Sequence, residues 1–279
     1  MGKYEIRKTP VFHDFYSRLK AIALTVFEWE NLPETCNARF LENTLFEDGQ
    51  AIFVDDKDRK YINVRCTPAS ELNIYNEATS YTAFSTGYSE IFKMDECVFI
   101  RNNYLAKSTA STIILYAERL AEIELTLQVN LKAQKTPILI RTEEKTKRSL
   151  EVVYNQYDEN KPKIIASKGL SEKPFEVLRT DAPFLVDRLR EEKRAVWNEA
   201  LEFLGINTNP SDKKKERLIV SEVESNNEEI DIQGDTMLLA RQEACGQINK
   251  LFNLNVSVRK RLKEEVVEVP EEELEESEV

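Results

Sequence analysis

Histidine, cysteine and glycine are scarce in this sequence of 279 residues, and their scarcity argues against several kinds of site. The only histidine is His13, and the cysteines Cys36, Cys66, Cys97 and Cys245 form no CxxC pair. Zinc sites and disulfide frameworks need such ligands in clusters at short spacings, so we expect neither. Scattered thiols are typical of proteins in a reducing compartment such as a cytoplasm.

The same scarcity weakens the common enzymatic interpretations. Catalysis of the Ser-His-Asp or Cys-His kind would have to use His13, which lies between Phe12 and Asp14 in a predicted helix and is better explained by packing or surface exposure. The seven glycines form neither GxxxxGK nor GxGxxG, so a phosphate-binding loop is unsupported. We predict no catalytic residue, no metal and no cofactor, and any nucleotide hydrolysis would have to come from a partner protein.

Long hydrophobic runs are also missing. The apolar segment 21–27 is far too short to cross a bilayer, and the first residues lack the basic and then apolar layout of a secretory signal. With 41% hydrophobic and 32% charged residues, the composition is typical of a globular protein without a membrane partner.

The net charge of −11 is concentrated at one end of the chain. Residues 264–279 contain nine glutamates and no lysine or arginine, so they account for nine of the eleven net negative charges and leave −2 for the rest. We expect segment 263–279 to be a disordered, solvating tail. Because the body is nearly neutral, contact with nucleic acid would have to come from locally placed basic residues.

The pattern of apolar residues predicts alternating helical and β-rich segments. After an arm at 1–11, a stripe with steps of three or four predicts a helix at 12–32, which Pro33 ends. Residues 33–107 contain short β-prone runs, such as 51–54 and 61–64 on either side of a turn, and indicate a small α/β unit.

A long helix is predicted at 108–135, with Ser108 as its N-cap. Its apolar residues form two stripes, which is typical of a helix packed between neighbours. The first stripe comprises Ile113, Tyr116, Leu120, Ile123, Leu127 and Leu131, and the second comprises Ile114, Leu125 and Val129.

The second half of the chain repeats this alternation. Residues 136–180 are β-rich, and a helix at 181–205 follows with Asp181 as N-cap, Pro183 in the first turn and Gly205 at the C-terminal cap. A polar loop at 206–234 precedes a helix and strand at 235–262. The fold class predicted by this order is α+β.

Basic residues provide the only candidates for a functional surface. Arg179 and Arg188 flank the start of the helix at 181–205, and the loop carries Lys213, Lys214, Lys215 and Arg217. In a monomer, a solvated and salt-bridged face with Glu191 and Glu192 would explain the helix residues. In a ring, one basic residue per subunit would form a belt of charge that attracts phosphates without reading sequence.

Several short strings, in the same order along residues 20–258, resemble a known family. The strings are FEWENLP (27–33), AQKTP (133–137), VYNQY (153–157), TDAP (180–183), AVWNE (195–199) with FLGI (203–206), KKER (214–217), and EAC (243–245) with LNV (254–256). The chain is similar to the upper collar, or head-tail connector (portal), proteins of picovirus-type short-tailed phages.

This resemblance implies a portal fold and a set of partners. A homo-oligomeric ring, a dodecamer in the family, would stand at one capsid vertex of the virion after assembly in the host cytoplasm. Double-stranded DNA would be packaged and ejected through its channel without sequence specificity. Major capsid and scaffolding proteins, lower collar or tail proteins and, transiently, a packaging ATPase would be its partners.

The resemblance also implies roles for each segment. Segments 12–32, 108–135 and 181–205 would be stem helices, 136–180 the clip, 33–107 and 235–262 the wing or crown, and 206–234 the channel loop. Arg179 and Arg188 fall on the family's basic channel rings, where the best-known member has lysines.

There are two departures from the family pattern. Its reference member begins with a strongly basic arm that helps to hold a packaging RNA, whereas residues 1–11 carry only Lys3, Arg7 and Lys8 against Glu5, so an RNA partner is doubtful. The acidic tail has no counterpart that aligns. Two alternatives stay open: a tail or capsid interaction protein without a DNA channel, and an enzyme on nucleic acid, which the missing motifs disfavour.

Overall fold

The computed structural model describes residues 3–69, 72–134, 138–140, 175–177, 183–206 and 220–261. The chain divides into two compact units, Met1–Leu120 with Val196–Val279, and Ala121–Ala195. Both helices and strands are well represented, and the predicted α+β class is confirmed. No helix in these ranges is long and apolar enough to cross a membrane.

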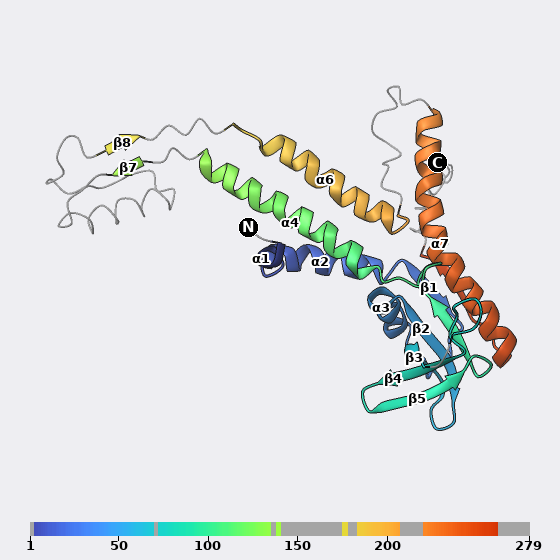
Figure 1. The fold of residues 1–279 in the computed structure, drawn as a ribbon. Helices are drawn as coiled ribbons and strands as arrows, with labels where there is room; N and C mark the ends of the chain where they lie inside the picture. Colours follow the sequence, from blue (N-terminus) through green and yellow to red (C-terminus); the bar gives the residue numbers. More distant parts are fainter. Residues whose placement is uncertain are drawn as a thin grey trace, which may run out of the picture. The chain divides into compact units, whose positions relative to one another are not determined.

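A five-stranded antiparallel sheet forms the centre of the first unit (Figure 1). Its strands are β2 (Gln50–Asp56), β3 (Lys60–Pro68), β4 (Ser80–Ser85), β5 (Tyr88–Lys93) and β6 (Cys97–Arg101), in the order β5-β4-β3-β2-β6. The helix α3 (Ala38–Asp48) precedes the sheet and packs against β2 and β3. Residues 33–107 therefore contain both helix and strands, as their sequence predicts, within the larger first unit.

Strand β2 is buried on both faces, which explains its uninterrupted apolar run. Ala51 and Phe53 belong to a core cluster that also contains residues of α3 and of a C-terminal helix, whereas Ile52 and Val54 pack in a second cluster with β3, β4 and β6. All four side chains are at most 1% exposed. A strand between two cores has no solvent face, so it needs no polar residues in alternation.

The N-terminal part of the chain forms less helix than its pattern predicts. After α1 (Lys3–Ile6), α2 spans Pro10–Ala23 and is capped by the Thr9 hydroxyl, and Phe27–Glu30 is a strand, β1. The expected helix at 12–32 is therefore wrong beyond Ala23. The β-branched Thr25 bonds back to the carbonyls of Ala21 and Ile22, and β1 pairs antiparallel with β9 (Ser257–Lys260).

The helix α4 (Ala110–Ala133) agrees with the prediction for 108–135 to within two residues. The Ser108 hydroxyl accepts a hydrogen bond from the N–H of Ala110 at 3.1 Å and donates to the carbonyl of Phe46 at 2.9 Å. Ser108 therefore caps the start of α4, as predicted, and also ties this start to α3.

The helix α6 (Val186–Phe203) is shorter at its start than predicted. Residues 183–185 are not helical, and Asp181 lies outside the described ranges. In the second unit, Asn130 of α4 donates to the carbonyl of Pro183 at 2.9 Å and accepts from the N–H of Leu185 at 3.1 Å. These bonds hold the segment before the helix to α4, so that α6 begins only at Val186.

Gly205 ends α6 as its sequence position predicts. It has a left-handed φ of 74°, and the N–H groups of Gly205 and Ile206 bond to the carbonyls of Glu202 and Leu201 at 2.8 and 3.0 Å. This is the hydrogen-bond pattern of a Schellman cap, in which glycine avoids the steric cost of a positive φ.

The last long helix, α7 (Val220–Phe252), begins well before its predicted start at 235. Residues 220–234 were expected to belong to a polar loop, and this expectation is wrong. Their glutamates and glutamine permit a helix, but without an apolar stripe the sequence does not announce one. A glycine inside a helix costs about 1 kcal/mol relative to alanine, and α7 nevertheless continues through Gly234.

Little of the predicted clip lies within the described ranges. Its first and last parts contribute β7 (Ile138–Ile140) and β8 (Phe175–Val177), which pair antiparallel. The remainder of 136–180, the first part of the predicted channel loop (207–219) and the acidic tail lie outside them.

Candidate functional site

Only one of the predicted DNA-contacting residues falls within the described residues. Arg188 lies in the first turn of α6 and is exposed. Arg179 and the four basic loop residues lie outside the described ranges, so their roles stay predictions. The loop residues are Lys213, Lys214, Lys215 and Arg217.

Arg188 presents its guanidinium to solvent. Among the residues that the structure describes, no carboxylate lies within ion-pair distance of it. Glu191 and Glu192 follow at the helical spacings of three and four residues and are also exposed. In a single subunit, these carboxylates reduce the local positive potential, as the alternative of a solvated face requires.

The neighbouring lysine of α6 has a different role. Lys193 is half-buried and donates to Glu124 of α4 at 2.9 Å, within the second unit. Arg190 and Arg194, one turn apart, are exposed. The helix therefore uses Lys193 to pair with α4 and leaves its arginines in solvent, where phosphates could reach them.

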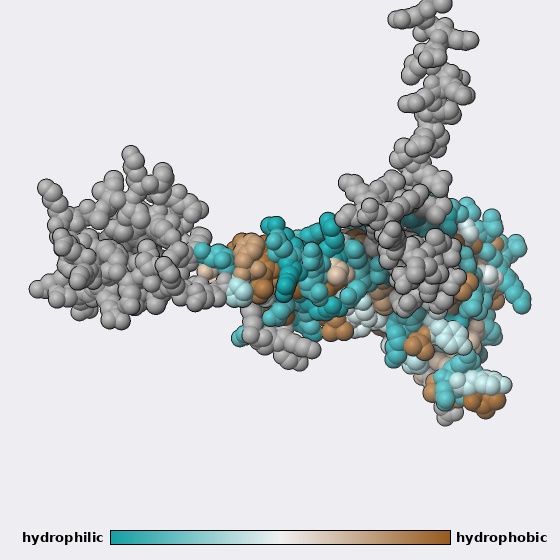
Figure 2. All heavy atoms as spheres, turned by 90° about the horizontal axis from the view of Figure 1, so that it is seen from above, coloured by the Kyte–Doolittle hydropathy of each residue, from teal (hydrophilic) through white to brown (hydrophobic). Residues whose placement is uncertain are grey.

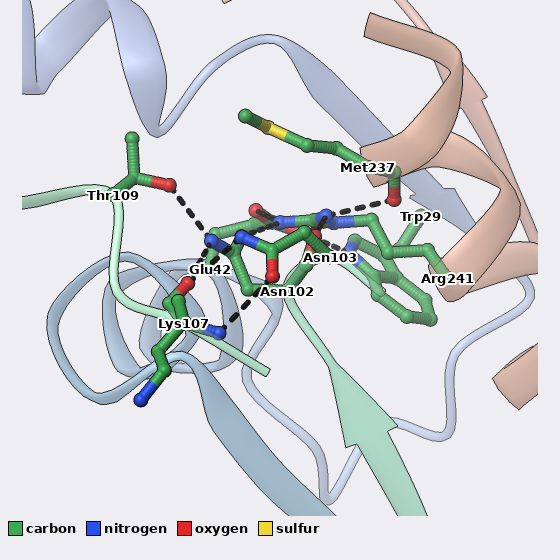
Figure 3. A network of polar contacts seen from close by, with 8 residues as sticks. All are labelled: Trp29, Glu42, Asn102, Asn103, Lys107, Thr109, Met237 and Arg241. Carbon is green, nitrogen blue, oxygen red and sulfur yellow. Dashed lines mark hydrogen bonds and ion pairs between the residues drawn. The ribbon is translucent and has the colours of Figure 1, made fainter. Parts of the chain in front are cut away.

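A buried ion pair in the first unit was not predicted from the sequence (Figure 3). The side chains of Arg241 on α7 and Glu42 on α3 are only 2% and 5% exposed. The Nε and Nη2 groups of Arg241 donate to the two carboxylate oxygens of Glu42 at 2.9 and 2.8 Å. This two-point geometry is the strongest that an arginine and a carboxylate can form.

The remaining donors of Arg241 bind Asn102, in the loop after β6, and Met237, one turn earlier in α7 (Figure 3). Its Nη1 donates to the backbone carbonyls of Asn102 and Met237, both at 2.9 Å, and its Nη2 also donates to the Asn102 side chain at 3.0 Å. The guanidinium carbon lies 4.1 Å from the centre of the Phe27 ring. Arg241 thus joins α7 to β1, to α3 and to the loop that follows β6.

Glu42 and Asn102 are bonded on their other sides as well. The indole N–H of Trp29 donates to Glu42 at 2.8 Å, and the Asn102 amide donates to the Thr109 hydroxyl at 2.7 Å and the Lys107 carbonyl at 2.9 Å. A buried charge is tolerated only when it is paired and its remaining hydrogen-bonding groups are satisfied. This network meets that requirement and anchors the C-terminal half of α7, the helix whose first part overlaps the predicted channel loop.

A signal for this network exists in the sequence. Met237, Ala244 and Ile248 recur on one face of α7 and are buried, and Arg241 occupies the same face. A charged residue on an apolar stripe indicates a buried ion pair. The stripe alone does not identify Glu42 as the partner, because it lies almost two hundred residues earlier in the chain.

The cysteine thiols and His13 are the side chains that catalysis of the Ser-His-Asp or Cys-His kind would need. Burial raises the pKa of the cysteine thiols, to about 11 for Cys36 and Cys97 and about 12 for Cys66 and Cys245, which leaves them protonated near neutral pH. His13 packs edge-on against the Phe12 ring at 5.6 Å. Within the described ranges, no group of three or more acidic, cysteine or histidine side chains could hold a metal.

The fold is similar to folds found in phage portal structures. It matches a chain in the structure of the portal and tail of native bacteriophage P68 with a TM-score of 0.50 and 16% identity, over 94% of this chain and 90% of that one. It also matches an HK97 family phage portal protein from Corynebacterium diphtheriae with a TM-score of 0.47 and 8% identity, over 93% and 95% of the two chains.

A family model gives the more specific assignment. The model described as Phage Connector (GP10) matches residues 1–267, which is nearly the whole chain. The chain therefore belongs to the phage connector family, a family of structural proteins rather than enzymes. The predicted resemblance to head-tail connectors is confirmed.

Proposed function

We propose that this connector forms a ring, a dodecamer, whose central channel passes double-stranded DNA into and out of the capsid. The observation that carries the proposal is the match of the connector family model to residues 1–267. The ring would stand at one capsid vertex, in contact with major capsid and scaffolding proteins. Tail proteins, and transiently a packaging ATPase, would dock on it, since the chain itself carries no motif for nucleotide hydrolysis.

Uncovered apolar side chains support assembly into an oligomer. Figure 2 shows hydrophobic residues gathered over the C-terminal end of α4 and the N-terminal end of α6. Val129 and Leu131 of α4 are 65% and 43% exposed, and Phe184, just before α6, is 59% exposed. Val129 belongs to the second apolar stripe of α4, which a neighbouring subunit would cover.

Exposed arginine on α6 supports contact with the DNA backbone. Arg188 would contribute one positive charge per subunit, and in a ring these charges would form a belt that attracts phosphates regardless of sequence. Arg179 and the basic loop residues Lys213, Lys214, Lys215 and Arg217 are proposed to add to this channel surface. A body of nearly neutral charge suits a channel in which DNA has to move rather than stay bound.

The first experiment is to measure the native mass of the purified assembly and to average its end-on views by electron microscopy. We expect a closed twelve-fold ring with an open axial hole wide enough for duplex DNA. A chain that stays monomeric or dimeric even with capsid and scaffolding proteins present would refute the ring. It would favour the alternative, a tail or capsid interaction protein without a DNA channel.

The second experiment separates the channel from the ring. Arg188→Glu introduced into the phage should leave ring formation unchanged but reduce the nuclease-protected DNA per particle, and Arg188→Lys should restore it. Lys250→Glu, the same charge reversal at an exposed position on α7, is the matched control and should have no effect. If Arg188→Glu particles retain normal DNA, Arg188 belongs to a solvated face and not to the channel.

A further inference from the structure

Two large apolar side chains project into solvent from the loop between β6 and α4. Tyr104 is 76% exposed and Leu105 is 72% exposed. Single apolar residues on a surface need no explanation, but two adjacent ones at the tip of a loop resemble the anchor residues of protein interfaces. We call Tyr104 and Leu105 the 104–105 knob.

The loop is held in one conformation by its own hydrogen bonds. The Asn103 side chain accepts from the N–H groups of Leu105 and Lys107, both at 3.1 Å, and donates to the Lys107 carbonyl at 3.0 Å (Figure 3). The guanidinium of Arg101 lies over the Tyr104 ring at 5.8 Å. A fixed loop loses little conformational freedom on binding, so its apolar residues are prepared for a partner.

A hollow of about 370 Å³, open to solvent, lies elsewhere on the same unit. Its lining residues come from the start of α3, from β3 and from the turn between β4 and β5. They are Thr35, Asn37, Phe40, Arg59, Ile62, Asn63, Val64, Ser85, Thr86, Gly87 and Tyr88. We call this feature the β3 hollow.

The β3 hollow combines an apolar surface with a rigid polar frame. Phe40, Ile62 and Val64 supply apolar surface, which is where a tyrosine or leucine side chain gains most by leaving water. Asn37 and Asn63 bond to each other in both directions, at 2.9 and 3.2 Å, and hold the start of α3 against β3. The hollow is thus built before any partner arrives.

The knob and the hollow lie at opposite ends of α3. The N-cap residue Asn37 lines the hollow, whereas the loop that carries the knob is fixed to the C-terminal turn, where Thr109 and Ser108 bond to the carbonyl of Phe46. The eleven residues of α3 span about 16 Å at 1.5 Å per residue. A subunit therefore cannot fill its own hollow with its own knob.

The charges beside the two features are complementary. Lys107, next to the knob, is exposed, and Arg101 at its base is paired with Glu243 at 2.9 Å. At the hollow, the Tyr88 hydroxyl donates to Asp56 at 2.9 Å and shares a longer contact of 3.3 Å with the exposed Glu90. Asp56 also lies 3.6 Å from Arg59, the basic residue of the lining, and Glu90 is an exposed acidic group beside the hollow that a partner's lysine can reach.

We propose that the 104–105 knob of one subunit inserts into the β3 hollow of the next copy of this chain. Contacts between two different surfaces of the same unit are head-to-tail, and they generate a closed ring when the rotation between neighbours is a fraction of a full turn. The inference rests on the proposed function, because it specifies one of the contacts that would build the connector ring.

Cross-linking tests the contact directly. The full-length double variant Leu105→Cys/Thr86→Cys, treated with a short bis-maleimide after assembly, should give a ladder of covalent dimers, trimers and larger species on a denaturing gel. Each single variant alone should give none, and a co-assembled mixture of the two single variants should stop at dimers. The unmodified protein controls for its native cysteines, whose thiols have pKa values raised by burial.

The outcomes separate this inference from the proposed function. A ring visible by electron microscopy with no cross-link in the double variant would overturn the knob contact and leave the ring intact as a proposal. Dimers from Leu105→Cys alone would indicate a symmetric contact between two knobs and would also overturn it. If no ring forms, the proposed function fails. The contact is then judged from the cross-linking alone: a ladder supports it, and the absence of a ladder overturns it.

A substitution series provides a second measurement. Tyr104→Ser/Leu105→Ser should raise the protein concentration needed for half-maximal assembly at least tenfold, since both side chains would lose their partner. Ile91→Ser, at an apolar position that is 66% exposed and has no exposed apolar neighbour in the sequence, is the matched control and should leave assembly unchanged. An unchanged assembly midpoint for the double serine variant, with normal thermal unfolding of the subunit, would contradict the proposal.

Discussion

Replacing Arg241 with methionine removes a buried charge and leaves its partner Glu42 without a cation. The substitution keeps most of the side-chain volume but deletes the two bonds to Glu42 and the three to Asn102 and Met237. Breaking a buried ion pair in this way costs about 3–5 kcal/mol, because the remaining charge stays buried and unpaired. In a domain of this size, each kcal/mol of lost stability lowers the melting temperature by about 2–4 °C, so we expect Arg241→Met to melt about 6–20 °C below the wild type.

A double-mutant cycle tests whether the cost comes from the pair. Glu42→Leu alone should also be strongly destabilising, since it leaves the arginine buried without its counter-charge. In the double variant Glu42→Leu/Arg241→Met no charge is left unpaired, so its loss should be smaller than the sum of the single losses by about 2–3 kcal/mol. Urea denaturation followed by tryptophan fluorescence measures all three, and Trp29 lies in the network itself.

The matched control uses the same substitution at an exposed ion pair. Arg259 is half-exposed and pairs with Glu28 and Glu30, so Arg259→Met should cost much less, as exposed pairs contribute little. A loss below about 1 kcal/mol for Arg241→Met, or additive losses in the cycle, would refute the view that this ion pair anchors α7.

Three further predictions concern the first unit. Gly49→Ala would place a Cβ 2.5 Å from the backbone of the β6–α4 loop at a φ of 81°, and should lower the free energy of unfolding by more than about 2 kcal/mol. Gly87→Ala, at a φ of 72° with open space around it, should lower it by only about 1–2 kcal/mol. Thermal unfolding measures both, and equal losses would contradict the clash at Gly49. The hydrogen bond from Lys20, and to a lesser extent the one from Arg65, lowers the pKa of Glu47 despite its partial burial. The stabilisation is therefore present above the unfolded pKa near 4.5 and is lost as pH falls through the lower folded value, so the stability difference between wild type and Glu47→Gln should shrink between pH 7 and about pH 3. A constant difference would refute this linkage. Because burial raises the pKa of all four thiols to about 11 or 12, Ellman's reagent at pH 8 should react slowly with the folded protein and rapidly with four thiols in denaturant, and four fast thiols in the native state would contradict their burial.

Local patterns in the sequence determined the features that depend on neighbouring residues alone. The four consecutive apolar residues 51–54 predicted a β-strand, Ser108 predicted the start of α4, and Gly205 predicted the C-terminal cap of α6. Each of these signals acts over a few residues, because β-propensity and the capping of a helix are recognisable from local composition. The α+β class and the absence of catalytic motifs follow from the same kind of evidence.

The tertiary structure decided the features that depend on distant partners. Phe27–Glu30 continues an apolar stripe of helical spacing, and only its pairing with Ser257–Lys260, near the other end of the chain, makes it a strand. Arg241 sits on an apolar face of α7, and only the position of Glu42 on α3 explains why a charge is buried there. Strand pairing and ion pairing join residues that are far apart in sequence, so no local pattern contains them, and the packed unit had to bring the partners together.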